Sequence, residues 1–160
     1  MSILKEAPAD PTQLENEDDA AIAKLRKSFE TQQTAFAANR NPSLAERRER
    51  LEALIGMMMG NRTRISEALN SDFGAHPQHA SDLIEVLGVV GRAIYVLEHL
   101  VEWTKPSPRD VDPGLYGSAK AYIEYQPKGV IGNMVPWNFP FDLSVGPMTE
   151  MLAAGNRIIV

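Results

Sequence analysis

A carboxamide held between two prolines is the feature of this sequence with the clearest chemical meaning. Asn138 lies between Pro136 and Pro140, directly after the apolar run 129–135. Proline has no N–H for a strand ladder and keeps the residue before it extended, so the strand ends there and the backbone around Asn138 is stiff. Ligands of open α/β sheets bind beyond the carboxyl ends of the strands. A side-chain amide held there can donate hydrogen bonds to a developing negative charge.

Plainer interpretations of these residues exist. Asn138 and its prolines are ordinary turn formers, and Trp137 is also a common core residue, so composition alone favours a simple turn. Gly129 and Gly132 lack the spacing of a dinucleotide-binding glycine loop, and are more typical of a close backbone approach.

Two histidines, His76 and His79, have a spacing that suits a metal ion on a helix. Pro77 lies between them and no further ligand is near in the sequence. We therefore expect no metal site.

Composition sets the general class of the protein. The chain has 160 residues, a net charge of −5, 44% apolar and 23% charged residues, and no cysteine. These values are typical of a globular protein with one core, and the mildly acidic balance argues against nucleic acid as a partner. The apolar runs are far shorter than a membrane span, and no signal-peptide core is visible at the start. The lack of disulfides fits a reducing cytoplasm.

The first two thirds of the chain predict helices. Residues 1–17 are rich in Pro, Asp, Glu and Ala and are expected to form a flexible arm. Apolar residues at helical spacing then predict helices over 18–38, 44–59, 62–69 and 80–103. The inward residues expected are Ile22, Leu25, Phe29 and Phe36 in the first helix, Leu44, Leu51, Leu54, Ile55 and Met58 in the second, and Leu83, Ile84, Leu87, Val90, Ile94, Leu97 and Val101 in the last.

Charged and capping residues refine the second helix. Ser43 and Glu46 have the spacing of a capping box. Arg47, Arg48 and Arg50 alternate with glutamates and predict a solvated face rather than a nucleic-acid patch.

The last third of the chain has a different residue pattern, which predicts strands and loops. Residues 104–117 hold three prolines and two glycines and predict no regular element. Alternating apolar and polar residues predict an antiparallel strand over 119–125, followed by a buried strand over 129–135. A helix over 141–154, capped by Gly155 and Asn156, leads to a strand that starts at Ile158. This strand–helix–strand order predicts the start of a parallel sheet, and we expect the chain to be the front part of a longer fold.

Several of these motifs together resemble the aldehyde dehydrogenase superfamily. The resemblance covers residues 18–160 and is strongest after Tyr125, where Pro-Trp-Asn-Phe-Pro at 136–140 is followed by Ala-Ala-Gly-Asn at 153–156. Phe141, Asp142 and Leu143, with the short arm, resemble the branch near the class 3 enzymes. Within that branch the chain is most similar to members that oxidise coniferyl aldehyde, a phenylpropenoid aldehyde.

The resemblance implies an activity. Family members oxidise an aldehyde to the acid with NAD or NADP, through a cysteine thiohemiacetal and a thioester. Asn138 matches the asparagine that stabilises the oxyanion. Met134, Val135, Pro136 and Trp137 match the strand end that lines the cofactor site, and Phe139 and Leu143 match positions that line the substrate tunnel.

The resemblance also implies a division of the α/β fold. Residues 18–117 would be the helical part of the cofactor-binding domain, 118–126 a strand that pairs subunits into a homodimer or homotetramer, and 127–160 the start of a Rossmann-like βαβ unit. Because the chain has no cysteine, it lacks the nucleophile and is expected to be inactive alone. The alternative is a non-catalytic helical interaction module or pseudoenzyme fragment.

Overall fold

The amino-terminal helix is longer than the sequence predicts. The computed structural model describes residues 11–74 and 77–160, so most of the expected arm and His76 lie outside the described residues. Helix α1 spans Pro11–Ala38. The prediction of a flexible arm is therefore wrong for 11–17, because Pro11 is favourable at a first helical position, where its missing N–H would have no partner.

Helix α2 spans Leu44–Gly60 and begins with the predicted capping box. The Ser43 hydroxyl accepts from the Glu46 backbone N–H at 3.2 Å, and Glu46 Oε2 accepts from the Ser43 N–H at 2.7 Å. The Ser43 N–H and hydroxyl both donate to the Glu46 carboxylate and hold the pKa of Glu46 below its ordinary value. The predicted inward face is confirmed at Leu51, Leu54 and Met58, whereas Leu44 is exposed beside the cap.

After α3, Arg62–Phe73, one long helical run contains three segments with two kinds of turn. It consists of α4, Gln78–Ala80, the π-helix η1, Ser81–Leu87, and α5, Gly88–Trp103. The predicted helix over 80–103 is therefore confirmed in extent, but the wide π turn shifts its register.

The buried face of this run differs from the predicted one. Predicted inward residues Leu83, Ile84, Ile94 and Val101 are exposed, while the adjacent face is buried. This face packs on α2 and on α7, Pro140–Ala153. One core cluster joins Leu54, Met58, Val86, Val89, Ala93 and Val145, and a second joins Leu51, Val96, Leu100 and Ala153.

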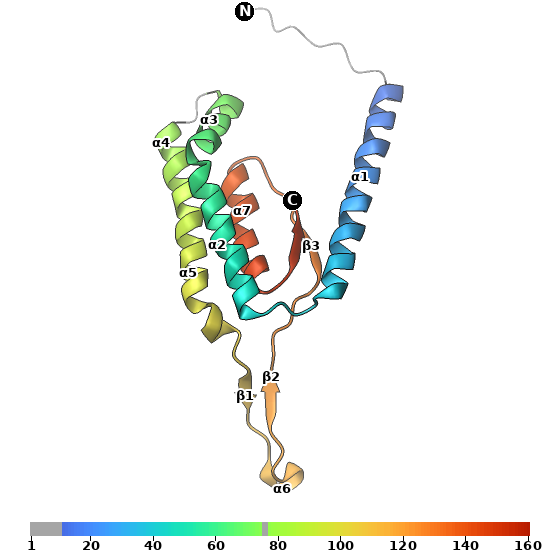
Figure 1. Ribbon diagram of the computed structural model, residues 1–160, viewed down its shortest axis with the longest axis vertical. Helices are drawn as coiled ribbons and strands as arrows, with labels where there is room; N and C mark the ends of the chain where they lie inside the picture. Colours follow the sequence, from blue (N-terminus) through green and yellow to red (C-terminus); the bar gives the residue numbers. More distant parts are fainter. Residues whose placement is uncertain (1–10, 75–76) are drawn as a thin grey trace, which may run out of the picture.

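A thin hairpin extends away from the helices, with the short helix α6, Pro113–Tyr116, at its tip (Figure 1). Strand β1, Ser107–Arg109, pairs antiparallel with β2, Ala121–Ile123. The prediction that 104–117 holds no regular element is wrong, because the Pro-rich stretch acquires order by pairing with a strand farther along the chain. The predicted antiparallel strand is confirmed in a shorter form.

A second pair of strands lies between α7 and α1 (Figure 1). Strand β3, Val130–Gly132, pairs in parallel with β4, Arg157–Ile159, and Ile131 lies opposite Ile158. The predicted strand–helix–strand unit with a parallel pair is confirmed. Because β3 and β4 are parallel, their carboxyl ends lie at the same edge of the pair. The chain leaves β3 toward α7 from that edge.

Candidate functional site

The segment between β3 and α7 carries the predicted site residues. It has no regular structure from Asn133 to Phe139, with a bend over 137–139. Strand β3 ends three residues earlier than the sequence predicts, although the Asn133 N–H still donates to the Ile159 carbonyl at 2.8 Å. The segment therefore starts at the carboxyl end of the parallel pair, where α/β proteins bind ligands.

Most predicted site residues on this segment face solvent. The Asn138 side chain is exposed, and Met134 and Trp137 are 98% and 88% exposed. Pro136 and Phe139 are exposed as well, whereas Val135 and Leu143 are half-buried. Six of these seven residues, 134–139, are contiguous in the chain, and none of the seven lines any of the five cavities described next.

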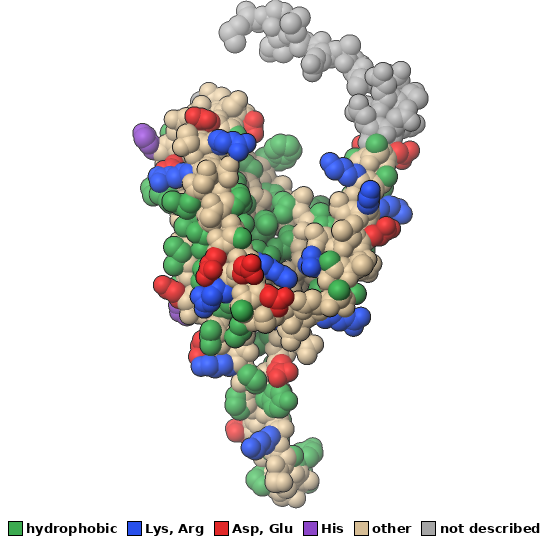
Figure 2. Space-filling model, in the orientation of Figure 1, with side chains coloured by type: hydrophobic (Ala, Val, Ile, Leu, Met, Phe, Trp, Pro, Cys, Tyr) green, Lys and Arg blue, Asp and Glu red, His purple; other side chains and the backbone are tan. Residues whose placement is uncertain are grey.

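Five cavities formed by the described residues lie elsewhere. Two neighbouring cavities lie around Arg47 and Tyr125, a third lies beside Arg62 and His79, and another lies at the base of the hairpin beside the end of α5. An open apolar groove lies between α1 and the strands β3 and β4, and hydrophobic side chains gather in the corresponding hollow in Figure 2. None of these five cavities is lined by Asn138.

Asn133 anchors the start of the segment to the middle of α7. Its Nδ2 donates to the Ser144 carbonyl at 2.9 Å and lies 3.5 Å from the Leu143 carbonyl. Pro147 is inside the helix and has no N–H for that Leu143 carbonyl, four residues earlier. The Asn133 amide therefore supplies a donor where the helix lacks one.

Glu85 anchors the end of the segment from a remote helix. This residue of η1 is fully buried, and its Oε2 accepts from the Phe141 N–H at 2.9 Å and from the Asp142 N–H at 3.4 Å. Helix α7 has no side-chain cap at Phe139. Glu85 thus supplies the acceptor that the first turn of α7 requires.

The residues after α7 connect it to both strands. Gly155 adopts φ +87° and ends the helix, as its sequence predicts. Asn156 is buried, and its Oδ1 accepts from the backbone N–H groups of Lys128 and Gly129 at 2.7 and 3.1 Å. Its Nδ2 donates to the Met151 carbonyl at 3.2 Å. The Gly-Asn pair therefore fixes where β3 begins relative to α7.

Arg47 corrects the prediction of a solvated arginine face. It is 6% exposed, and its guanidinium donates to the Pro42 and Ala153 carbonyls and to Asn41 Oδ1. Burial, and to a lesser extent the charge of Arg50, lowers its pKa. Nothing in its alternating charge run distinguishes Arg47 from the exposed Arg48. Glu85, by contrast, is a lone charge in an apolar run, which is a detectable signal.

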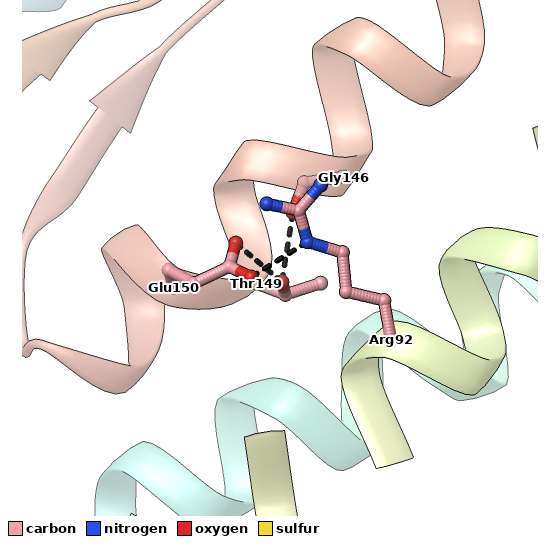
Figure 3. A network of polar contacts seen from close by, with 4 residues as sticks. All are labelled: Arg92, Gly146, Thr149 and Glu150. Carbon is pink, nitrogen blue, oxygen red and sulfur yellow. Dashed lines mark hydrogen bonds and ion pairs between the residues drawn. The ribbon is translucent and has the colours of Figure 1, made fainter. Parts of the chain in front are cut away.

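A separate polar cluster crosses from α5 to α7 (Figure 3). Arg92 Nε lies 2.6 Å from Glu150 Oε1, and the buried Thr149 hydroxyl lies 2.7 Å from the Gly146 carbonyl and 2.8 Å from Glu150 Oε2. One hydroxyl proton cannot satisfy both acceptors fully. Arg92 and Glu150 are both partly exposed, so the ion pair contributes little to the stability of the fold.

Both the sequence and the fold of this chain are similar to those of known proteins. The profile of the aldehyde dehydrogenase family matches residues 2–160. The chain belongs to the aldehyde dehydrogenase family. Among curated relatives, a probable coniferyl aldehyde dehydrogenase of Caulobacter vibrioides is 35% identical over 144 residues, which are 89% of this chain and 30% of that protein. One of the same description from Pseudomonas aeruginosa is 36% identical over 140 residues, 87% of this chain and 29% of that protein.

Solved aldehyde dehydrogenase structures share the fold. AldH of Staphylococcus aureus, in a substrate-bound state, superposes with a TM-score of 0.78 and 24% identity, over 84% of this chain and 29% of that one. PnpE in complex with nicotinamide adenine dinucleotide gives 0.72 and 26%, over 85% and 27%. Succinic semialdehyde dehydrogenase of Streptococcus pyogenes, with NADP+, gives 0.72 and 24%, over 84% and 28%. This aldehyde dehydrogenase chain thus spans about 30% of the length of its curated relatives.

The described ranges hold neither a membrane-spanning helix nor a cluster of metal ligands. No helix in the described ranges 11–74 and 77–160 is both long and apolar enough to cross a membrane. Within those same ranges, no three His, Cys, Asp or Glu side chains gather as metal ligands would. His79 therefore has no such cluster around it there.

Proposed function

We propose that this chain is the amino-terminal part of an NAD(P)-dependent aldehyde dehydrogenase that oxidises an aromatic, coniferyl-like aldehyde to its acid. The observation that carries the proposal is the position of Asn138, between two prolines at the carboxyl end of the parallel pair β3 and β4. The names of the two bacterial relatives support the substrate class.

Asn138 has the role of an oxyanion donor in this proposal. Its side-chain amide is exposed at the end of a segment that is fixed at both ends, by Asn133 and by Glu85. A neutral amide aims an N–H dipole at a negative oxygen without itself titrating. Asn138 would therefore stabilise the tetrahedral oxyanion formed when a nucleophile attacks the aldehyde carbonyl. These 160 residues contain no cysteine that could be that nucleophile.

The neighbouring residues fit a dinucleotide. Met134 and Trp137 are almost fully exposed and offer an apolar surface at the carboxyl end of β3, against which a planar ring can pack. Val135 and Pro136 form the rest of that strand end, and Phe139 and Leu143 are proposed to line the substrate path. NAD or NADP, when bound, supplies the hydride acceptor, and two of the similar structures hold these dinucleotides.

The hairpin is proposed to pair subunits into a homodimer or homotetramer. Strand β2 pairs with β1 alone in the described structure, and Tyr122 and Ile123 on it are 59% and 40% exposed. An open strand edge with apolar side chains is a common route to pairing between chains.

The test is kinetic. The natural reading frame is expressed through its stop codon, and coniferyl aldehyde-dependent formation of NADH or NADPH is followed. Asn138→Ala is expected to lower kcat about 10²–10³-fold and to leave cofactor affinity nearly unchanged. Gln33→Ala, an exposed change on α1, is the control.

Two outcomes would contradict the proposal. An intact reading frame whose product oxidises no aldehyde would favour the non-catalytic interaction module. An Asn138→Ala enzyme with normal kcat and weakened cofactor binding would remove Asn138 from the oxyanion role.

A further inference from the structure

A buried acidic side chain lies at the start of α7, next to the segment that carries Asn138. Glu85 is fully buried in η1, and its Oε2 lies 2.9 Å from the Phe141 nitrogen and 3.4 Å from the Asp142 nitrogen. Both N–H groups belong to the first turn of α7, 56 residues or more from Glu85 in the sequence. An acidic group is retained at such a depth only when polar partners compensate its loss of water.

Helix α7 depends on this contact for its start. Phe139, at the cap position, provides no side-chain acceptor, and Pro140 provides no N–H. The first N–H groups that the helix must satisfy are those of Phe141 and Asp142, and Glu85 accepts from both. The position of Glu85 therefore fixes the place and direction in which α7 begins.

The π-helix brings Glu85 to that place. Ser81, Glu85 and Val86 are all fully buried on η1, so the wide turn directs both Glu85 and its apolar neighbour inward. Short π-helical segments are rare and are frequent at functional sites. Here the π segment packs against α7.

We propose that Glu85 is a positioning residue for Asn138, acting through the first turn of α7. Asn138 lies three residues before Phe141, and Pro140, with its fixed φ, joins them. A shift of α7's first turn is thereby transmitted to the amide that faces the reacting oxygen. This inference rests on the proposed function of Asn138.

The experiment uses the product of the natural reading frame. Glu85→Asp, which is one methylene shorter, and Glu85→Gln, which keeps an oxygen at the same reach, are each made with Asn138 intact and with Asn138→Ala. Glu98→Gln, an exposed glutamate on α5, is the matched control. The measured quantities are kcat, KM for aldehyde and cofactor, and the thermal midpoint.

With Asn138 intact, Glu85→Asp is expected to lower kcat about ten-fold or more, because small misplacements of catalytic groups are costly. Glu85→Gln should lose less, roughly three-fold, since one oxygen still accepts. KM for the cofactor should change less than about two-fold. In the Asn138→Ala background both changes should have almost no further effect on kcat, because the group that they position is absent.

Equal fold-losses of kcat in both backgrounds, or a lower thermal midpoint with normal kcat, would overturn the proposal and leave Glu85 a structural residue. If Glu85→Asp does not fold, the Glu85→Gln pair alone decides between these results. The proposed function fails separately, when Asn138→Ala with an intact Glu85 has normal kcat. That result would remove the proposal for Glu85 as well.

Discussion

Arg47 donates from its guanidinium to the carbonyl of Ala153, 106 residues later in the sequence, at 3.0 Å. The carbonyl lies in the last turn of α7, where backbone acceptors have no partner within the helix and the helix dipole favours a cation. Two further hydrogen bonds, to Pro42 and Asn41, hold the same guanidinium beside the start of α2. Arg47 thus joins the beginning of one helix to the end of another.

Arg47→Lys is expected to destabilise the fold by about 2–4 kcal/mol, since a single ammonium cannot serve three separate acceptors in a buried site. The measurement is the free energy of unfolding from urea titration. Arg48→Lys is the control, because Arg48 is exposed on the same helix. Equal stability of the two variants would show that the buried hydrogen bonds contribute little.

Gly155→Ala is expected to cost about 2–4 kcal/mol. Gly155 has φ +87°, and an added Cβ would lie 2.8 Å from Pro127 Cγ and 3.0 Å from Arg47 Cζ. Gly56→Ala is the opposite control: its site is open and helical, so a gain of about 0.5–1 kcal/mol is expected. Thermal midpoints of both variants check the pair, and a neutral Gly155→Ala would contradict the proposed clash.

Acid is expected to weaken the start of α2. Hydrogen bonds from the Ser43 backbone and hydroxyl, with a smaller one from Asn39, hold the pKa of Glu46 below its ordinary 4.5. A lowered carboxyl pKa adds stability that is complete above about pH 4.5 and is lost as the pH falls through the folded-state value.

Glu46→Gln should therefore be less stable than the parent at pH 6, and the difference should shrink at pH values well below 4.5. Urea titrations at several pH values measure it. Glu49→Gln, an exposed change on α2, is the control. A difference that stays constant with pH would show that the capping contribution does not depend on charge.

The groove between α1 and the strands should bind an apolar dye. Leu25 and Phe29 are 55% and 44% exposed there, opposite Val130 and Ile159. Large exposed apolar patches favour association, so the 160-residue chain expressed alone is expected to aggregate and to enhance ANS fluorescence. Replacing Leu25 and Phe29 together by Gln should reduce both signals.

Leu115→Gln serves as the control for the groove, because Leu115 is 75% exposed on α6, far from it along the chain. Light scattering and ANS titration provide the measurements. Unchanged ANS binding after the double replacement would show that the dye binds an apolar surface other than this groove.

Local signals predicted the elements of the fold well. Ser43 and Glu46 predicted the start of α2, and Gly155 predicted the end of α7, because both depend on residues close in sequence. The burial of the long helix was mispredicted at Leu83 and Ile84. Apolar residues form a wide stripe on this helix, and the π turn rotates its register, so periodicity alone does not select the buried part of the stripe.

The candidate site was predicted in part. The sequence placed Asn138 between a strand and a helix, which the structure confirms. It did not predict Glu85 or Asn133 as anchors. The charge of Glu85 within an apolar run is a local signal, but its partners, like those of Asn133, lie on another element and cannot be identified from the sequence. The roles of Asn138 and its neighbours in binding and chemistry stay predictions.

The hairpin of β1 and β2 has strands of three residues each, and each strand pairs with only the other in the described structure. A two-stranded ribbon of this length is marginally stable by itself in water. The protection of its amide protons from deuterium exchange therefore reports whether a second chain pairs with the ribbon. Fast exchange at Tyr122 in a dilute sample and slow exchange in a concentrated one would report a neighbouring chain on the ribbon before any enzymatic assay is run.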